Sequence, residues 1–225
     1  MEENNEEKKL RRNRDRFPQY YSTSLFGASQ FYFCVKTTNT INMEAQEFIT
    51  QHLKKGQVSI IAGRPFSGKT SLAISICINL AQNGEKTLFV SLELSTEQIK
   101  ERFFNNDKIR NLEKCIKIDD TRDMSTKAWK DISISYLRSE IEFTKANYLI
   151  IDYIQLMSSD KNELKKICEE LTNMASDNNI SILLLSQLSR YVEDFDFPMP
   201  QDLLFLQECN FEGIDVVFID QYAKK

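Results

Sequence analysis

The chain has 225 residues with 41% hydrophobic content, enough to bury one sizeable core but not a second full domain. Its formal net charge is -4, which lacks the basic excess typical of a nucleic-acid-binding face. The five cysteines are scattered and His52 has no partner at metal-ligand spacing, so we expect reduced thiols and no zinc site. No apolar run is long enough to cross a bilayer and the acidic amino terminus does not resemble a signal peptide. We therefore expect a soluble, cytoplasmic protein without membrane contact.

The first 44 residues differ in composition from the rest of the chain. Residues 1–16 are charged and polar, an acidic block followed by a basic run from Lys8 to Arg16, and we expect a flexible tail. A phosphate-binding arm is the alternative. Residues 17–44 form an amino-terminal extension rich in aromatic side chains, too apolar between Phe17 and Val35 to stay in solvent. This extension packs either on the core of its own chain or on a neighbouring subunit, and the sequence leaves both open.

Residues 45–225 have the pattern of one folded domain in which strands alternate with helices. The expected helices are Ala45 to Leu53, Lys69 to Ala81, one opened by the capping box Ser95-Thr96-Glu97-Gln98, Trp129 to Phe143, and Asp160 to Asn178. The expected strands are Val58 to Ala62, Thr87 to Leu92, Cys115 to Ile118, Tyr148 to Asp152, Ile180 to Ser186, and Ile214 to Ile219. Because these strands lack polar alternation and are separated by helices, the pattern predicts an α/β fold, a parallel sheet with helices on both faces.

The octapeptide Gly63-Arg64-Pro65-Phe66-Ser67-Gly68-Lys69-Thr70 matches the pattern G-x-x-x-x-G-K-[ST] between an expected strand and an expected helix. In such a P-loop the backbone amides turn inward around phosphates, and the dipole of the following helix adds to the attraction. Lys69 would neutralise β- and γ-phosphate oxygens, and the Thr70 hydroxyl would bind Mg²⁺. The sequence therefore predicts binding of ATP with magnesium, through Gly63, Arg64, Pro65, Ser67, Gly68, Lys69, Thr70 and Ser71.

Two carboxylates stand where expected strands end. Asp152 follows the apolar run Tyr148 to Ile151 and would bind the magnesium ion, although an isolated aspartate at this place is more often a helix cap or a turn former. Glu93 follows another apolar strand, where a carboxylate can reach across the sheet's edge toward an attacking water. A solvated glutamate in the first turn of a helix is the alternative for Glu93.

Four segments in a fixed order carry a resemblance to a known family. They are Ile60 to Thr70, Val90-Ser91-Leu92-Glu93-Leu94-Ser95, Ile151-Asp152-Tyr153-Ile154-Gln155-Leu156-Met157, and Leu185-Ser186-Gln187-Leu188-Ser189-Arg190. Together they resemble the successive motifs of the DnaB-type replicative DNA helicases, and the resemblance covers about Ala45 to Val217. It implies a RecA-like P-loop NTPase fold for this part of the chain.

The resemblance also implies roles for individual residues. Glu93 would be the base that activates water, Asp152 the magnesium ligand, and Gln187 the residue that senses the γ-phosphate and relays its state to a DNA-facing loop. The family is hexameric and holds ATP between subunits, with an arginine and a lysine supplied by the neighbour. A homo-oligomer, with a hexamer as the implied form, is therefore the expected assembly.

The sequence also departs from the family pattern. We expect this chain to lack the family's amino-terminal domain and the carboxy-terminal segment that supplies the intersubunit arginine finger. The loop Ser158-Ser159-Asp160-Lys161 carries no arginine where such helicases present a basic DNA-contacting loop. The stretch from Tyr191 to Glu212 contains acidic residues and no Lys or Arg, which disfavours a phosphate backbone.

Two functional hypotheses remain open. The first is an ATP-hydrolysing enzyme related to replicative DNA helicases, acting in DNA replication or in a mobile element. The second is a RecA-like switch or adaptor that binds ATP, hydrolyses it slowly and acts through partners without moving along DNA. Binding of single-stranded DNA has weak support in either case.

Overall fold

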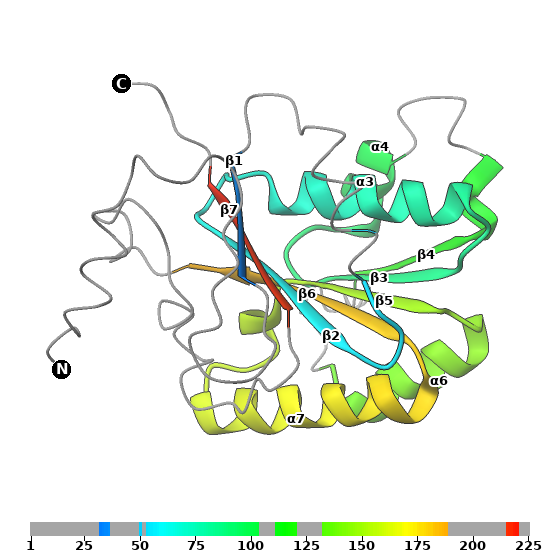
Figure 1. Cartoon of the computed structure of the whole chain (residues 1–225). Coiled ribbons are helices and arrows are strands. Elements are labelled where there is room, and N and C mark those ends of the chain that lie inside the picture. Colours follow the sequence, from blue (N-terminus) through cyan, green and yellow to red (C-terminus); the bar gives the residue numbers. More distant parts are fainter. Residues whose placement is uncertain are drawn as a thin grey trace, which may run out of the picture.

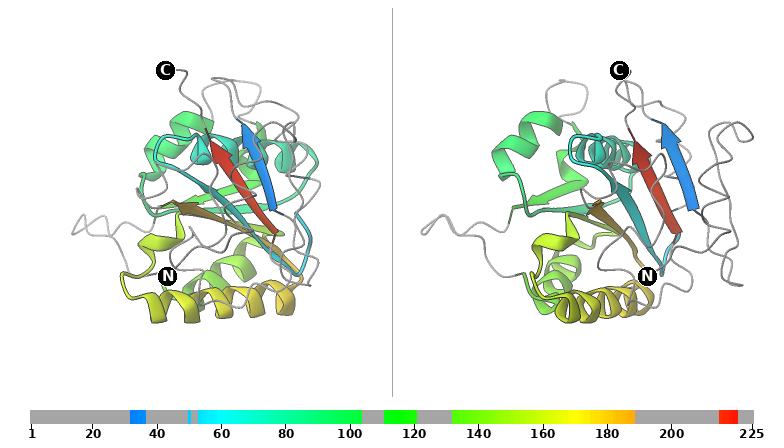
Figure 2. Two further views of the ribbon diagram at one scale, coloured as in Figure 1. Left: turned by 60° about the vertical axis from the view of Figure 1, so that its left-hand side comes forward. Right: turned by 90° about the vertical axis from the view of Figure 1, so that its left-hand side faces the viewer.

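Figure 1 presents the computed structural model of the chain, which describes residues 32–36, 50, 53–103, 111–120, 132–188 and 215–220. For residues 32–36, 215 and 218–220 the description is limited to the backbone. The described residues form one sheet with helices on both of its faces (Figures 1 and 2). The predicted α/β class with a parallel, doubly covered sheet is confirmed.

The sheet is 7-stranded and every paired strand runs parallel to its neighbour. Its strands are β1 (Tyr32–Lys36), β2 (Val58–Gly63), β3 (Thr87–Ser91), β4 (Ile116–Asp119), β5 (Tyr148–Asp152), β6 (Ser181–Gln187) and β7 (Asp215–Asp220). They lie in the order β1-β7-β2-β6-β5-β3-β4. Because all strands point the same way, the carboxyl ends of β2, β3, β5 and β6 meet at one edge of the sheet.

The helices lie in two layers. They are α3 (Lys69–Gln82), α4 (Thr96–Phe103), α6 (Ile134–Thr144) and α7 (Lys161–Asn178), with short 3-10 turns η1 (Asn111–Lys114) and η2 (Ile154–Leu156). Helices α3 and α4 cover one face of the sheet, and α6 and α7 cover the other (Figure 1).

Successive strand residues supply the two cores in turn. In β2, Ile60 packs on the α6 and α7 side and Ile61 on the α3 and α4 side. In β5, Ile151 packs on the α6 and α7 side and Ile150 on the α3 and α4 side. Side chains alternate between the faces of a strand, so a strand covered on both faces has buried positions on both and is largely apolar. This double burial explains why the sequence shows no polar alternation in these strands.

Most predicted elements occur within one residue of their predicted starts. The capping box is confirmed, since the Ser95 amide donates to Gln98 Oε1 (3.0 Å) and the Gln98 amide donates to Ser95 Oγ (3.3 Å). The helix predicted from Trp129 instead begins at Ile134, because Ser133 caps it by accepting from the Tyr136 amide. Of the helix predicted from Ala45 to Leu53, the structure describes Thr50, which is helical, and Leu53, which is not, and the remaining residues lie outside the described ranges.

Strand β1 is an element that the sequence did not single out. It comes from the aromatic-rich extension and pairs with β7, with Tyr32 opposite Val216 (Figure 2). These five residues therefore add a strand to the chain's own sheet. This agrees, for these residues, with the alternative in which the extension packs on its own chain rather than on a neighbouring subunit. The remainder of residues 17–44 and the tail of residues 1–16 lie outside the described ranges.

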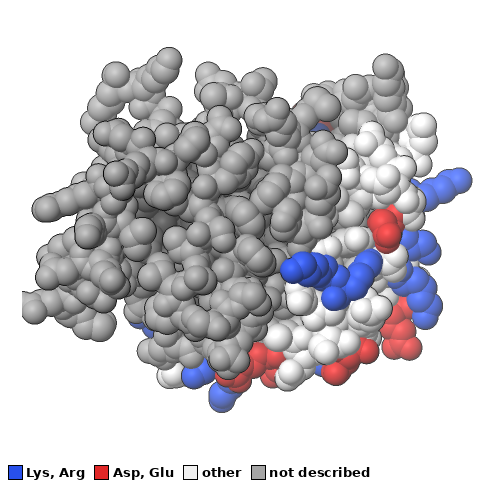
Figure 3. Space-filling view, in the orientation of Figure 1, with Lys and Arg blue, Asp and Glu red and all other residues white. Residues whose placement is uncertain are grey.

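The described surface carries charges of both signs. In Figure 3, Lys and Arg side chains are interspersed with Asp and Glu on the part of this face that is described. Among the described helices, none is both long enough and apolar enough to cross a membrane.

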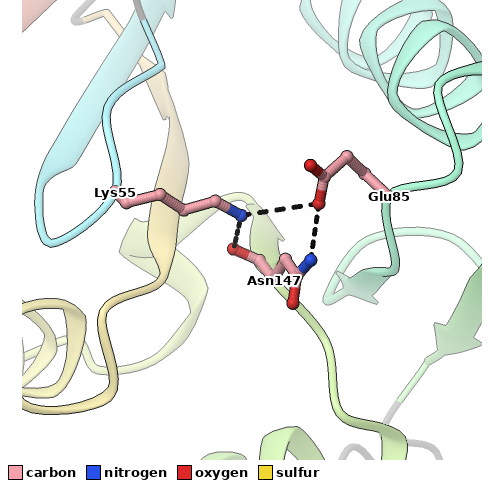
Figure 4. Close-up of polar contacts among 3 residues, drawn as sticks. All are labelled: Lys55, Glu85 and Asn147. Atoms are coloured by element: carbon pink, nitrogen blue, oxygen red, sulfur yellow. Dashed lines mark hydrogen bonds and ion pairs between the residues drawn. The ribbon is translucent and has the colours of Figure 1, made fainter.

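A polar cluster of Lys55, Glu85 and Asn147 ties three loops together at the amino-terminal edge of the sheet (Figure 4). Lys55 Nζ donates to the Asn147 carbonyl oxygen (3.1 Å) and lies 3.6 Å from Glu85 Oε2, which accepts from Asn147 Nδ2 (2.5 Å). The Lys55 ammonium also lies 3.7 Å from the centre of the Tyr148 ring. Because these residues precede β2, β3 and β5, the cluster fixes the starts of three strands.

The Lys55→Met substitution should therefore lower the free energy of unfolding by about 1 kcal/mol, through loss of one charged hydrogen bond and a partly exposed ion pair. Urea denaturation of the two proteins measures the difference. Lys86→Met is the matched control, because Lys86 lies in the same loop as Glu85 and is exposed. An equal loss in both variants would contradict a specific role for the cluster.

Candidate functional site

The loop between β2 and α3 has the backbone of an anion-binding turn. Gly68 has φ 91°, a left-handed conformation that favours glycine, and α3 begins directly after it at Lys69. No side chain caps this end of α3 in the described structure, and its first turn contains no acidic residue. The positive end of the helix dipole is therefore available to an anion.

Two side chains of the loop are buried in a way that suits phosphate oxygens. Lys69 is only 8% exposed, and its Nζ donates to the carbonyl oxygens of Gly63 (3.0 Å) and Arg64 (2.8 Å). The Ser67 hydroxyl is buried and has no hydrogen-bond partner in the described structure. A buried polar atom without a partner is costly, so it is expected where a ligand supplies the missing bond. Arg64 and Pro65 are half-buried, and Ser71 is exposed.

The two predicted magnesium ligands are in contact. Thr70 Oγ1 donates to Asp152 Oδ2 at 2.8 Å, which joins the first turn of α3 to the end of β5. Asp152 is 1% exposed. Burial raises the pKa of Asp152 to about 6, and the charge of Glu93 adds to the rise, while the Thr70 hydrogen bond and the charges of Lys69 and Arg102 oppose it. A hydroxyl and a carboxylate side by side are the oxygen ligands that Mg²⁺ prefers.

Glu93 approaches the same place from the neighbouring strand. Ser91, the last residue of β3, is the register partner of Asp152, and the Leu92 amide donates to the Asp152 carbonyl oxygen (2.7 Å). Glu93 itself is exposed, and its charge acts on the pKa of Lys69 and of Asp152. Burial lowers the pKa of Lys69, and the carboxylates of Asp152 and Glu93 counteract the effect. A solvent-accessible carboxylate therefore lies near enough to the buried Lys69 and Asp152 for its charge to act on both.

Gln187 ends β6 beside the start of the P-loop. It is the register partner of Gly63, and the Leu188 amide donates to the Gly63 carbonyl oxygen (3.0 Å). Its side chain is half-buried. The structure thus brings every predicted site residue, from Gly63 to Ser71 together with Glu93, Asp152 and Gln187, to the carboxyl edge of the sheet.

Sequence reasoning missed two residues at this edge. Arg102 lies in α4, and its charge reaches Asp152 and lowers the pKa of that carboxyl. It stands two helical turns after Ser95, so the capping box already places both residues on one face of the helix. Gln155 lies in η2 and hydrogen-bonds the end of β6. It stands in one of the four segments that carry the family resemblance, but no sequence pattern indicates those contacts.

A parallel sheet in which an inner strand leads into a phosphate-binding loop, with a carboxylate at the end of a nearby strand, defines a P-loop ATPase domain. The family described as "ATPase: KaiC" matches residues 40–199, and the chain belongs to that family.

The chain's sequence relatives include replicative DNA helicases. The chain is 31% identical over 197 residues to a "Probable plasmid replicative DNA helicase" of Chlamydia trachomatis, a match that covers 75% of this chain and 44% of the relative. It is 28% identical over 180 residues to the "Replicative DNA helicase DnaB" of Synechocystis sp., covering 64% of this chain and 20% of that protein. The chain thus spans less than half the length of these relatives.

Solved structures agree with the sequence relatives. One solved ATPase domain is 25% identical to this chain with a TM-score of 0.59, over 76% of this chain and 72% of that one. A DnaB-like replicative helicase solved for its interactions with primase has a TM-score of 0.62 and 24% identity, over 77% of this chain and 50% of that one, and supports the fold alone. The predicted resemblance to DnaB-type helicases and the RecA-like fold are confirmed.

The raised pKa of Asp152 predicts a pH-dependent stability without nucleotide and metal. The folded protein binds this proton more tightly than the unfolded chain, so the free energy of unfolding should fall as pH rises from about 4 to about 6. Asp152→Asn carries no charge and keeps an acceptor for Thr70. At pH 8 it should be more stable than the wild type by roughly 2 to 3 kcal/mol.

Urea denaturation at a series of pH values tests this expectation. The difference between Asp152→Asn and the wild type should shrink as the pH falls through 6 and vanish only below about 4, where Asp152 is protonated in both the folded and the unfolded wild type. A difference that stays constant across this range would contradict the assignment of a proton to Asp152.

Proposed function

We propose that this chain binds ATP with magnesium at residues 63–71 and hydrolyses it, with Glu93 as the general base. One observation carries the proposal: a buried ammonium, a contacting hydroxyl and carboxylate, and an exposed carboxylate converge at the start of α3. Phosphoryl transfer needs these groups, since its catalysis depends on positioning and on stabilising charge.

The phosphates are bound by donors that lie close together in sequence. The amides at the start of α3 and the Ser67 hydroxyl donate to phosphate oxygens, around a loop whose other members are Gly63, Arg64, Pro65 and Gly68. Lys69 releases the carbonyl oxygens of its own loop and turns to the β- and γ-phosphates. Exchanging neutral acceptors for charged ones strengthens its hydrogen bonds.

Thr70 and Asp152 would hold the magnesium ion. When bound, Mg²⁺ supplies positive charge that offsets the negative charge on the transferring phosphate. Asp152 must be ionised for this role, and its pKa of about 6 leaves it ionised above neutral pH. Asp152 is almost completely buried and accepts from the Thr70 hydroxyl, so the two side chains are already placed side by side where they would hold the ion.

Glu93 takes the proton of the attacking water. Its exposure gives it access to solvent, and its position after β3 sets it across the sheet edge from Lys69. Gln187 contacts the γ-phosphate from the end of β6, next to Gly63. These roles follow the resemblance residue by residue and agree with the geometry of the site.

The names of the relatives favour a role in DNA replication or in a mobile element. A probable plasmid replicative DNA helicase and a replicative DNA helicase DnaB both occur among them. The family resemblance implies a hexamer with ATP bound at the interface between subunits. It also implies that the hexamer binds and moves along single-stranded DNA. The enzyme hypothesis is thus the first candidate.

A switch that does not move along DNA is the second candidate, and the loop after η2 favours it. Ser158 and Asp160 stabilise the start of α7 by hydrogen bonds. The Asp160 amide donates to Ser158 Oγ (3.0 Å), and the Glu163 amide donates to Asp160 Oδ1 (2.9 Å). The loop carries no arginine, and the sequence from Tyr191 to Glu212 has no Lys or Arg. These segments offer few phosphate contacts to a DNA strand.

Glu93→Gln should bind ATP with nearly wild-type affinity and lower its turnover by about 10² to 10⁴ fold, the usual contribution of a general base. Phosphate release and equilibrium binding of a fluorescent ATP analogue measure the two quantities. Lys69→Ala is the contrasting variant and should lose most of the affinity or all turnover. Full turnover in Lys69→Ala would remove the site assignment. If turnover collapsed in Asp152→Asn but not in Glu93→Gln, the roles assigned to the two carboxylates would be reversed.

We expect this chain by itself not to displace a DNA strand, and its ATP turnover to change little on adding single-stranded DNA. Any DNA affinity should come from the basic run Lys8 to Arg16, because each phosphate contact contributes counterion release. Fluorescence anisotropy at about physiological salt compares the wild type with a variant whose Lys and Arg residues in this run are replaced by Gln. Strand displacement that persists in this variant would favour the translocating enzyme over the switch.

A further inference from the structure

The side-chain amide of Gln155 holds the end of β6 from the side of β5. Its Nε2 donates to Ser186 Oγ (2.9 Å) and to the Gln187 carbonyl oxygen (2.9 Å), and its Oε1 accepts from the Gln187 amide (3.2 Å). One glutamine thus satisfies both backbone groups of Gln187. Only one orientation of the amide fits, since the carbonyl needs a donor and the N–H needs an acceptor.

These hydrogen bonds substitute for the backbone pairing that β5 would supply if it extended as far as β6. Strand β6 pairs with β5 as far as Leu184, opposite Ile151, and β5 ends at Asp152. On its other side β6 stays paired with β2 up to Gln187, opposite Gly63. Gln155 therefore completes the hydrogen bonding of the last residue of β6 where β5 no longer reaches.

The same residues connect to the P-loop by hydrogen bonds. The Leu188 amide donates to the Gly63 carbonyl oxygen (3.0 Å), and that oxygen also accepts from Lys69 Nζ (3.0 Å). The path from Gln155 through Gln187 and Leu188 thus ends on the lysine of the nucleotide site. A shift of the Gln187 backbone would change where its side chain stands relative to a γ-phosphate held by Lys69.

We propose that Gln155 is a positioning residue that aims Gln187 at the γ-phosphate. Because it takes Gln187 as the γ-phosphate contact, this assignment rests on the proposed function. Gln155 does not touch the nucleotide. It acts by fixing the direction of one backbone unit, and small misplacements of a contact residue are costly to catalysis.

The test is a comparison of affinities for a non-hydrolysable ATP analogue and for ADP, both with magnesium, by titration calorimetry. Gln155→Met keeps the volume of the side chain and removes its hydrogen bonds. We expect affinity for the ATP analogue to fall about tenfold while affinity for ADP stays nearly unchanged. Ser186→Ala, which removes one of the bonds, should move the ratio in the same direction by less and serves if Gln155→Met does not fold.

A double-mutant cycle separates positioning from a general loss of stability. If Gln155 acts through Gln187, then Gln155→Met added to Gln187→Ala should leave the affinity ratio where Gln187→Ala alone puts it. Lys55→Met, which weakens the opposite edge of the sheet, should leave the ratio at the wild-type value. An unchanged ratio in Gln155→Met, or losses that add in the double variant, would overturn the assignment.

The wild type separates this assignment from the proposed function. A wild type that prefers the ATP analogue to ADP but shows no turnover refutes the proposed hydrolysis, and the cycle still decides the role of Gln155. A wild type that binds both nucleotides equally, or neither, overturns the assignment of Gln155.

Discussion

All seven strands run in one direction, and this constraint governs where the chain can place its reactive groups. A parallel strand must be reached by a connection that returns to the other end of the sheet, so helices cover both faces and loops gather at the two edges. The carboxyl edge receives the P-loop, Glu93, Asp152 and Gln187 from separate strands. The amino-terminal edge receives the cluster of Lys55, Glu85 and Asn147 instead. The contacts that hold the strand starts together therefore lie at the opposite edge of the sheet from the residues of the candidate site.

The carboxyl edge carries local costs that the rest of the fold must offset. Asp152 is buried with a raised pKa, and the Ser67 hydroxyl is buried without a partner in the described structure. Phe66, in the same loop, has φ 62° and is 96% exposed, which is unfavourable both for its backbone and for its ring. Departures from good packing that gather at one place are typical of a binding site, where a ligand supplies the missing contacts.

The sequence predicted the elements and residues whose signal is local. Strand β5 and the P-loop each lie within one continuous apolar run or motif, and Ser95 and Gln98 form their capping box within one turn. Strand β1 was not foreseen, because its partner β7 is distant in the sequence and only the fold joins them. The contacts of Gln155 depend on how far β5 and β6 extend relative to each other, which no periodicity encodes. The predicted start of α6 was wrong, because the helix begins after Ser133, whose side chain caps it.

The pairing of β1 with β7 has a consequence for the order of events during synthesis. Tyr32 leaves the ribosome long before Val216, the residue opposite it. Strands β2 to β6 can form the centre of the sheet while β7 is still being made, but β1 has no edge to join until β7 has paired with β2. Contacts of such long separation form late because of the entropy of closing the intervening loop. The nascent chain must therefore carry its apolar β1 segment unpaired through most of translation, a period in which aggregation competes with folding.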